Sequence, residues 1–249
     1  MRPLLRKVKP ANGFANSFHL ILLIVLPAVI FVLVRLNFVQ LALSMVVLSK
    51  WRMFAVKPRF WSANIRANAI DIIVGLSIVV FMTQSGSAGL QLGWAALYGV
   101  WLIVIKPASS LLLMSLQAFI GQLCGLTALY LVGSERPLYG ITFLTALVCY
   151  LSARHFFDSF DEPYARLLSY TWGYFGAALA WLLGHLLLFY GLIAQPTLVL
   201  SALGYGLAGM YYLKHNDRLS KGVQRQIVFI MLSVVVVVLV FTDWGIKIV

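Results

Sequence analysis

Charged residues are scarce in this sequence. They make up 10% of the 249 residues, whereas an ordinary soluble domain carries roughly 25%. Hydrophobic residues account for 62%, and the mean hydropathy is +0.94. A soluble protein of this composition lacks the polar side chains that its surface would need, so a water-soluble fold is excluded. We therefore expect an all-α bundle of transmembrane helices with lipid as its solvent.

Cysteine is rare, and the common enzyme motifs are missing. Cys124 and Cys149 fall inside apolar runs with neither CxxC nor Cys/His spacing, which argues against a disulfide framework and against a zinc site. There is no P-loop, GxSxG, HExxH, or GxGxxG followed by an acidic residue. No motif therefore assigns the chain to a class of enzyme.

Acidic residues are the rarer of the two charge types. Nineteen Lys and Arg stand against 7 Asp and Glu, which gives a net charge of +12. Such a balance fits nucleic acid, acidic ligands or an anionic membrane surface as a partner. Because the basic residues lie between apolar runs, we expect them to meet anionic lipid headgroups at the cytoplasmic face. We expect no nucleic-acid partner.

Apolar segments separated by short breaks fill most of the chain. A spanning helix needs about 20 apolar residues, so nine segments account for a single integral membrane domain over residues 1–249. The second segment is the shortest. The predicted spans are 18–34, 36–49, 68–84, 90–105, 108–132, 138–154, 167–190, 197–213 and 226–243.

The distribution of Lys and Arg orients these spans. With the N-terminus in the cytoplasm, 16 of the 19 basic residues lie on the cytoplasmic side, and Arg35, Arg136 and Lys247 lie outside. Positive charge near span ends favours the cytoplasm. Without a span at 36–49, the four N-terminal basic residues would lie outside, and the split would weaken to 12 basic residues in the cytoplasm against 7 outside. We therefore keep nine spans with a cytoplasmic N-terminus, in the plasma (cytoplasmic) membrane.

Small residues recur every four positions in three of the predicted spans. In lipid, helices associate where small side chains allow close backbone approach. We interpret the pattern as packing surfaces within the bundle. The residues are Gly121 and Gly125, then Gly176, Ala180 and Gly184, and finally Ala202 and Gly206.

An ionisable residue within a span indicates either function or an internal ion pair. Asn64, Asn68, Asp71 and Gly75 are spaced to share one helix face, with Asp71 about a turn inside the membrane. We interpret Asp71 as a candidate site for a proton, a cation or a substrate amine. The alternative is a carboxylate paired with a neighbouring Lys or Arg.

A second polar stripe runs along the sixth span, and its residues are at helical spacing. It consists of Thr142, Thr145, Cys149, Ser152 and His155. The segment beyond it holds three of the chain's seven acidic residues, Asp158, Asp161 and Glu162, between Arg154 and Arg166.

These carboxylates are candidate Mg²⁺ ligands, with His155 as an acid or base near neutral pH. The stripe would continue to Asp158 and Glu162 if the helix runs on. A solvated loop with mutually neutralising charges is the alternative. We expect Asp71 and the segment from His155 to Glu162 to line one cavity that opens to the cytoplasm.

His185, in the middle of the seventh span, completes the set of candidate polar positions. It faces either the bundle, as a buried hydrogen-bonding residue, or an outer cavity. The loop 214–218 is interpreted as a solvated turn beside lipid headgroups.

Three classes of function fit this pattern. A carrier or permease for a small solute is favoured, because nine spans leave little protein mass outside the membrane and two spans carry polar stripes. A membrane-embedded enzyme acting on a lipid or polyprenyl substrate is the alternative, and only this class calls for Mg²⁺. The third class is a membrane scaffold or assembly subunit.

The helix count, the cytoplasmic N-terminus and the acidic loop between spans six and seven are similar to those of the UbiA-type prenyltransferases. That family uses two Asp-rich motifs, in the loops after spans two and six. The resemblance implies that Asp158 and Asp161 match part of the second motif. The loop after span two departs from the pattern, because it is basic, with only Asn64, Asn68 and Asp71 nearby.

Overall fold

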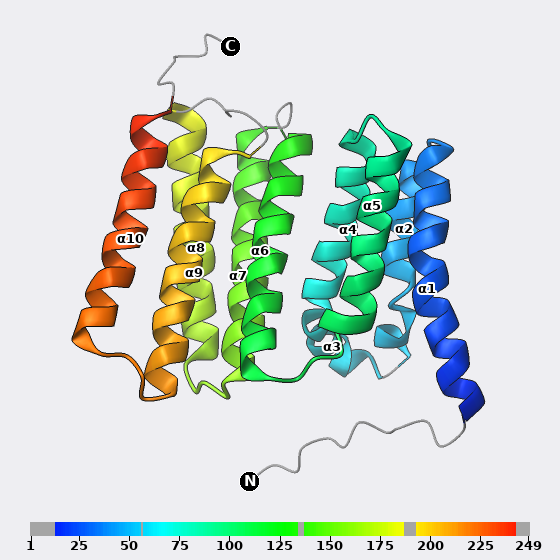
Figure 1. Ribbon diagram of the computed structural model, residues 1–249, viewed down its shortest axis with the longest axis horizontal. Coiled ribbons are helices and arrows are strands. Elements are labelled where there is room, and N and C mark those ends of the chain that lie inside the picture. Colours follow the sequence, from blue (N-terminus) through cyan, green and yellow to red (C-terminus); the bar gives the residue numbers. More distant parts are fainter. Residues whose placement is uncertain (1–12, 56, 134–136, 187–192, 243–249) are drawn as a thin grey trace.

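The bundle is entirely helical. In the computed structural model, residues 13–55, 57–133, 137–186 and 193–242 are described, the structure is 85% helical, and these ranges contain no strand. The helices stand side by side, with α10 at one end of the row and α1 at the other (Figure 1). The predicted all-α class is confirmed.

Ten α-helices and three shorter helical segments form the described part of the chain. Each of the nine predicted apolar segments overlaps a different α-helix, of which α2 is the shortest, and the basic stretch between the second and third segments forms η1, η2 and α3. The bounds are α1 (Gly13–Arg35), α2 (Val39–Leu48), η1 (Trp51–Phe54), η2 (Pro58–Phe60), α3 (Trp61–Ala67), α4 (Ala69–Gln84), α5 (Ala88–Val100), η3 (Trp101–Ile105), α6 (Leu111–Gly133), α7 (Leu138–Ser159), α8 (Ala165–Leu186), α9 (Gln195–His215) and α10 (Lys221–Val240).

Four helical segments in the described ranges are long and apolar enough to cross a membrane, which makes the chain an integral membrane protein by composition and length. They are Ala88–Ile105, Leu111–Gly133, Leu138–Ser159 and Lys221–Val240. Pro58–Ala67 and Ala69–Gln84 would add a fifth if the pair, bent by 58°, is one span. The apolar helix Val39–Leu48 is shorter, and its 10 residues cover about 15 Å of a hydrocarbon core roughly 30 Å thick.

Glycines set the contacts of α6 with its two neighbours. A Cβ at Gly121 would lie 2.9 Å from Ile70 on α4. A Cβ at Gly125 would lie 2.6 Å from Ile73 on α4 and 3.0 Å from Val148 on α7. These distances are shorter than van der Waals contact, so only glycine permits the approach. The predicted packing role of this GxxxG pair is confirmed.

The contact between α7 and α8 follows the same principle. A Cβ at Gly173 would lie 3.0 Å from the Ala146 carbonyl oxygen, and one at Gly176 would lie 2.8 Å from Cys149 Sγ. Near the other end of α8, Gly184 faces Leu138. Glycine thus lines α8 where it meets α7, and Cys149 is fully buried as a small packing residue.

The outermost helix, α10, is attached more loosely. None of its residues is buried, and its packing is against α9. At this contact Met231 fills the space beside Gly206, whose Cβ would lie 2.1 Å from the Met231 sulfur. A helix this apolar and this exposed needs lipid on most of its surface.

Three turns between helices share one backbone arrangement. Asn37, Asp161 and Asp217 have φ values of 61°, 52° and 54°. In each turn the next N–H donates to a carbonyl five residues back, as Glu162 N–H does to Phe157 O at 3.3 Å. This is the left-handed cap that ends many helices, and Asn and Asp adopt it more readily than other non-glycine residues. Asp161 and Asp217 therefore have a local role in reversing the chain.

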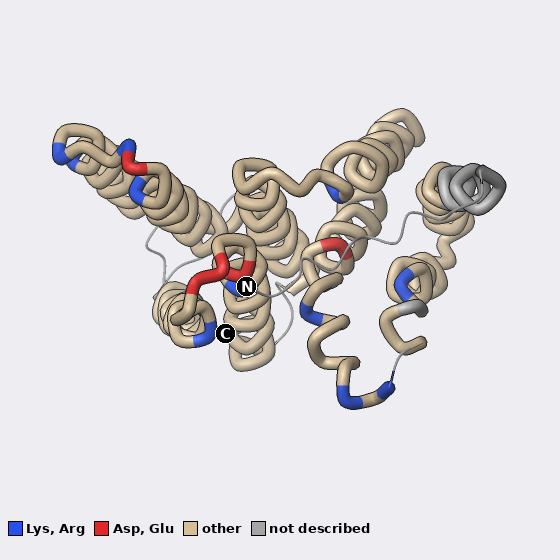
Figure 2. Tube along the Cα trace, turned by 90° about the horizontal axis from the view of Figure 1, so that it is seen from below, with Lys and Arg blue, Asp and Glu red and all other residues tan. Residues whose placement is uncertain are grey.

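Charge collects at the end of the bundle where α4, α6, α8 and α10 begin, shown from below in Figure 2. Five of the seven acidic residues of the sequence lie here together with most of the described Lys and Arg. The acidic residues are Asp71, Asp158, Asp161, Glu162 and Asp217. Among the described basic residues, Arg35 lies at the opposite end, at the close of α1.

Replacing Gly125 with alanine tests the packing of α6. Because the new methyl group would overlap a β-branched side chain, Gly125→Ala should destabilise the protein by about 1–3 kcal/mol. The matched control is Gly209→Ala in α9, where a Cβ meets nothing within 4 Å, and which should leave stability unchanged or raise it slightly. Thermal unfolding in detergent, followed by circular dichroism, measures both. Equal melting temperatures for the two variants would contradict the packing described.

Candidate functional site

Asp71 is enclosed by three partners. It lies in the first turn of α4 and is 9% exposed. Its Oδ2 is 2.6 Å from Lys106 Nζ and 3.5 Å from Lys50 Nζ, and Trp101 Nε1 donates to its Oδ1 at 3.1 Å. Both carboxylate oxygens are therefore engaged within the protein, which is the arrangement expected of an internal ion pair.

A π-helical turn brings two of these partners to the same carboxylate. The turn η3 covers Trp101–Ile105, and the Lys106 N–H donates to the Trp101 carbonyl at 2.8 Å. In a π-helix, residues five apart are joined by a hydrogen bond and lie on nearly the same face. In a regular α-helix, Trp101 and Lys106 would point to different faces. The π-turn is therefore what allows both to reach Asp71.

Lys50, Asp71 and Lys106 together carry one more positive than negative charge. Lys50 is 8% exposed, and burial lowers its pKa from the ordinary 10.5 to about 8. Asp71 opposes this shift in the pKa, while the positive charge of Lys106 adds to it. Lys50 therefore loses its proton more easily than an ordinary lysine.

Gln117 joins this cluster to α7. Its Nε2 donates to the carbonyls of Ile105 at 2.6 Å and Ala108 at 3.3 Å, which closes the end of the π-turn. Its Oε1 lies 3.1 Å from Nε2 of His155. Gln117 thus links His155 on α7 to the backbone beside Lys106, which pairs with Asp71.

Asp158 is shared by two arginines. Arg154 Nη2 lies 2.9 Å from Oδ1, one helical turn away on α7, and Arg66 Nε on α3 lies 3.9 Å from Oδ2. The side chain of Arg154 is 11% exposed and that of Asp158 is 45% exposed. Through its two arginine partners, the partly exposed Asp158 carboxylate links α7 to the neighbouring helix α3.

Asn64 and Asn68 do not extend the face of Asp71, contrary to the prediction. The helix breaks at Asn68, and α3 and α4 meet at an angle of 58°. Asn64 Nδ2 donates to the Met53 carbonyl at 3.3 Å, and Asn68 Nδ2 donates to the Asn64 carbonyl at 2.9 Å. Both amides therefore serve the backbone around the break, and a straight helix was the wrong assumption.

The predicted continuation of the α7 stripe to Glu162 is also wrong, because α7 ends at Ser159 and Asp161 turns the chain. Glu162 instead accepts hydrogen bonds from the Tyr211 hydroxyl and, at 3.3 Å, from the Tyr164 N–H. Within the described ranges, no three or more His, Cys, Asp or Glu side chains lie close enough together to hold a metal ion.

His185 lies apart from the other candidates, near the opposite end of α8. It is exposed, its Nδ1 is 2.8 Å from the Trp181 carbonyl oxygen, and its ring packs edge-on against the Trp181 ring. His185 therefore belongs to that end of the helix and not to the cluster around Asp71.

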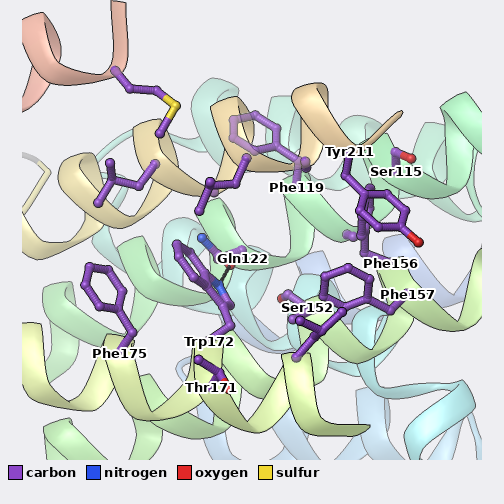
Figure 3. Close-up of a pocket in the computed structure, with 18 residues that line it drawn as sticks. Ser115, Phe119, Gln122, Ser152, Phe156, Phe157, Thr171, Trp172, Phe175 and Tyr211 are labelled. Carbon is purple, nitrogen blue, oxygen red and sulfur yellow. Dashed lines mark hydrogen bonds between the residues drawn. The ribbon is translucent and has the colours of Figure 1, made fainter. Parts of the chain in front are cut away.

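A large, partly open cavity lies on a different side of α6 and α7, bordered by these helices together with α8, α9 and Met231 of α10. Its volume is about 720 Å³, within the range of ligand-binding pockets. Figure 3 shows its aromatic walls, which are built by Phe119, Phe156, Phe157, Trp172, Phe175 and Tyr211. None of the predicted site residues lines it, and neither does any Asp, Glu, Lys, Arg or His.

A few polar groups interrupt the apolar wall. Gln122 Oε1 accepts from Trp172 Nε1 at 2.8 Å, and its Nε2 donates to the Leu200 carbonyl at 3.1 Å. Gly204 makes room for this amide, because a Cβ there would lie 2.9 Å from Gln122 Nε2. Ser152 is 2% exposed, and its hydroxyl has no hydrogen-bond partner among the described residues.

A second cavity, of about 570 Å³, lies between α6, α9 and α10. Ser115, Phe119, Ala208 and Met231 border both cavities. The two cavities are therefore adjacent, with these four residues on their common border.

Sequence reasoning identified Ser152 as part of a polar stripe but not the other cavity residues. Gln122 is a polar residue in the middle of the apolar segment 108–132, beside Gly121, and this was the signal available for it. Trp172 and Tyr211 gave no comparable signal, because aromatic residues are frequent throughout the chain.

No family model matches the chain, and neither a curated protein nor a solved structure is significantly similar to it. The likeness to the UbiA-type prenyltransferases therefore gains no support from known proteins, and the site is interpreted from its own geometry.

Neutralising Asp71 tests whether it holds the charged cluster together. Asp71→Asn leaves two lysines without a counter-charge, and this should cost about 3 kcal/mol of stability. In the double variant Lys50→Met, Asp71→Asn, the more buried lysine is also removed, so much of the loss should be recovered. Thermal unfolding of the wild type, both single variants and the double variant gives the coupling. Losses that simply add would show that the two side chains do not depend on each other.

Proposed function

We propose that the protein crosses the membrane nine times, through α1, α2 and α4 to α10, with its N-terminus in the cytoplasm. Consecutive long helices run in opposite directions (Figure 1), and the end that carries most of the described Lys and Arg is the end where α1 begins. Positive charge at span ends marks the cytoplasmic side. The short helix α2 completes its crossing with the turn at Asn37 and the residues after Leu48.

An odd number of spans places the two termini on opposite sides. A reporter that is active only in the cytoplasm should therefore be inactive when fused after Val249 and active when fused before Met1. A reporter that is active only outside should give the reverse. Cytoplasmic activity at both ends would contradict the nine-span topology.

We propose further that the protein is a carrier whose substrate is a largely apolar, membrane-soluble molecule. The observation behind this proposal is the 720 Å³ cavity among α6, α7, α8 and α9, with its aromatic walls and its lack of ionisable lining residues. Such a wall binds hydrocarbon well and offers an ion or a sugar little in exchange for its lost water. The proposed substrate class thus changes from the small solute expected from the sequence to a lipid.

The charged cluster around Asp71 supports this proposal, because its polar groups are already bonded to one another. The Asp71 carboxylate is paired with Lys106 and Lys50 and accepts a hydrogen bond from Trp101. Gln117 is hydrogen-bonded to His155. In this proposal the cluster fixes the cytoplasmic ends of α4, α6 and α7, and the apolar cavity beside it holds the substrate. The enzyme and scaffold alternatives make different predictions about what the cavity contains.

Lipids that copurify with the protein test the carrier proposal. An apolar lipid should be enriched in extracts of the purified wild type and recovered chemically unchanged after incubation. Ala153→Phe, which fills the cavity, should lose it. The control Ala178→Phe places the same ring on an exposed position of α8 and should retain it. Mass spectrometry of the extracts measures enrichment. A converted lipid would identify an enzyme, and no enrichment in the wild type would favour a scaffold.

A further inference from the structure

The hydroxyl of Ser152 differs from the others that border the cavity. Ser115 and Thr171 also line it, but their hydroxyls donate to backbone carbonyls one turn back, Leu111 at 2.7 Å and Leu167 at 3.0 Å. The Ser152 hydroxyl makes no such bond, although it is 2% exposed. Of the buried and unpartnered polar atoms in the described ranges, it alone lies on the wall of this cavity.

An unpaired hydroxyl in an apolar wall is unfavourable unless something bonds to it. Ser152 shares the cavity with the Gln122 amide, which lies midway along α6 and is held in place by Trp172 and by the Leu200 carbonyl. Figure 3 shows both polar side chains among the aromatic rings. The polar groups are thus few and fixed, and they lie deep among the helices.

The chemistry of this wall restricts what can bond there. Because no charged or titratable Asp, Glu, Lys, Arg or His lines the cavity, a charged group would lose its hydration without gaining a counter-charge. A hydroxyl or carbonyl oxygen loses much less and can pair with Ser152. The surrounding volume then needs to be filled by hydrocarbon.

From these observations we infer that Ser152, beside the Gln122–Trp172 pair, is the recognition point for the single oxygen of an uncharged lipid, such as a long-chain alcohol or a ring-bearing lipid with one hydroxyl or carbonyl. This inference rests on the proposed carrier function and adds the substrate class to it. Ser152 binds the oxygen, and the rings of Phe156, Trp172 and Phe175 contact the hydrocarbon body.

Three photoactivatable probes that carry the same diazirine test the inference: a long-chain alcohol, the hydrocarbon of equal length, and the phosphate ester of the alcohol. In detergent-purified wild type, the alcohol should label peptides of α6 to α9 about five-fold more than the hydrocarbon, which corresponds to one net hydrogen bond. The phosphate ester should label them least.

The matched pair of variants is Ser152→Ala and Ser115→Ala. Ser152→Ala should remove the preference for the alcohol over the hydrocarbon while keeping the labelling by the hydrocarbon. Because the deleted hydroxyl has no partner, this variant should also keep its melting temperature, so folding does not confuse the result. Ser115→Ala removes a hydroxyl from the same wall that is already bonded, and it should keep the preference.

The outcomes separate the inference from the function beneath it. Equal labelling by alcohol and hydrocarbon in the wild type, or a preference that survives in Ser152→Ala, overturns the role of Ser152 and leaves the carrier proposal standing. Stronger labelling by the phosphate ester overturns the uncharged class. If no probe labels α6 to α9 in the wild type, the carrier proposal itself fails.

Discussion

Close approach of helix backbones at glycine is the constraint on which this bundle depends. In lipid, apolar side chains gain nothing by leaving their surroundings, so helices hold together through dense packing and through polar contacts. Gly121 and Gly125 bring α6 against α4 and α7, and Gly173, Gly176 and Gly184 bring α8 against α7. These contacts fix the spacing of α6, α7 and α8, three of the helices that border the large cavity.

Polar and apolar chemistry are separated by the helices α6 and α7. On the side of α3 and α4, the carboxylates are paired with cations. Asp71 contacts two lysines and Trp101, and Asp158 contacts two arginines. Toward α8 and α9, the same two helices present aromatic rings and small residues. A π-turn supports the polar side, because it allows residues five apart to reach one carboxylate.

The sequence predicted the helical class and the nine apolar segments well, because hydropathy and turn residues act locally. It also indicated the glycine contacts, and it offered the ion pair of Asp71 as one of two alternatives. It did not predict the break at Asn68 or the π-turn at Trp101, and the second of these is tied to Trp101 and Lys106 meeting Asp71 from another helix. The cavity was missed for a related reason. Rings such as Trp172 and Tyr211 read as ordinary apolar residues until four helices place them around one space.

Most of the site residues predicted from the sequence were selected because they are charged. In the structure, Asp71 and Asp158 form ion pairs with lysines and arginines. Asp161 illustrates the difficulty: the same short polar side chain that suits a metal ligand also suits a left-handed turn, and here it makes the turn. Ser152 was visible only as one member of a stripe. Its distinction, a hydroxyl without a partner, exists only once the neighbouring helices are in place.

Met231 lines both cavities, and its side chain therefore affects the volume that a ligand could fill. It is one of four residues that border both cavities, and it comes from α10, whose main packing contact is with α9. A methionine side chain is unbranched and changes rotamer easily. A change of rotamer at Met231 would therefore alter the border between the two cavities without any movement of the backbone.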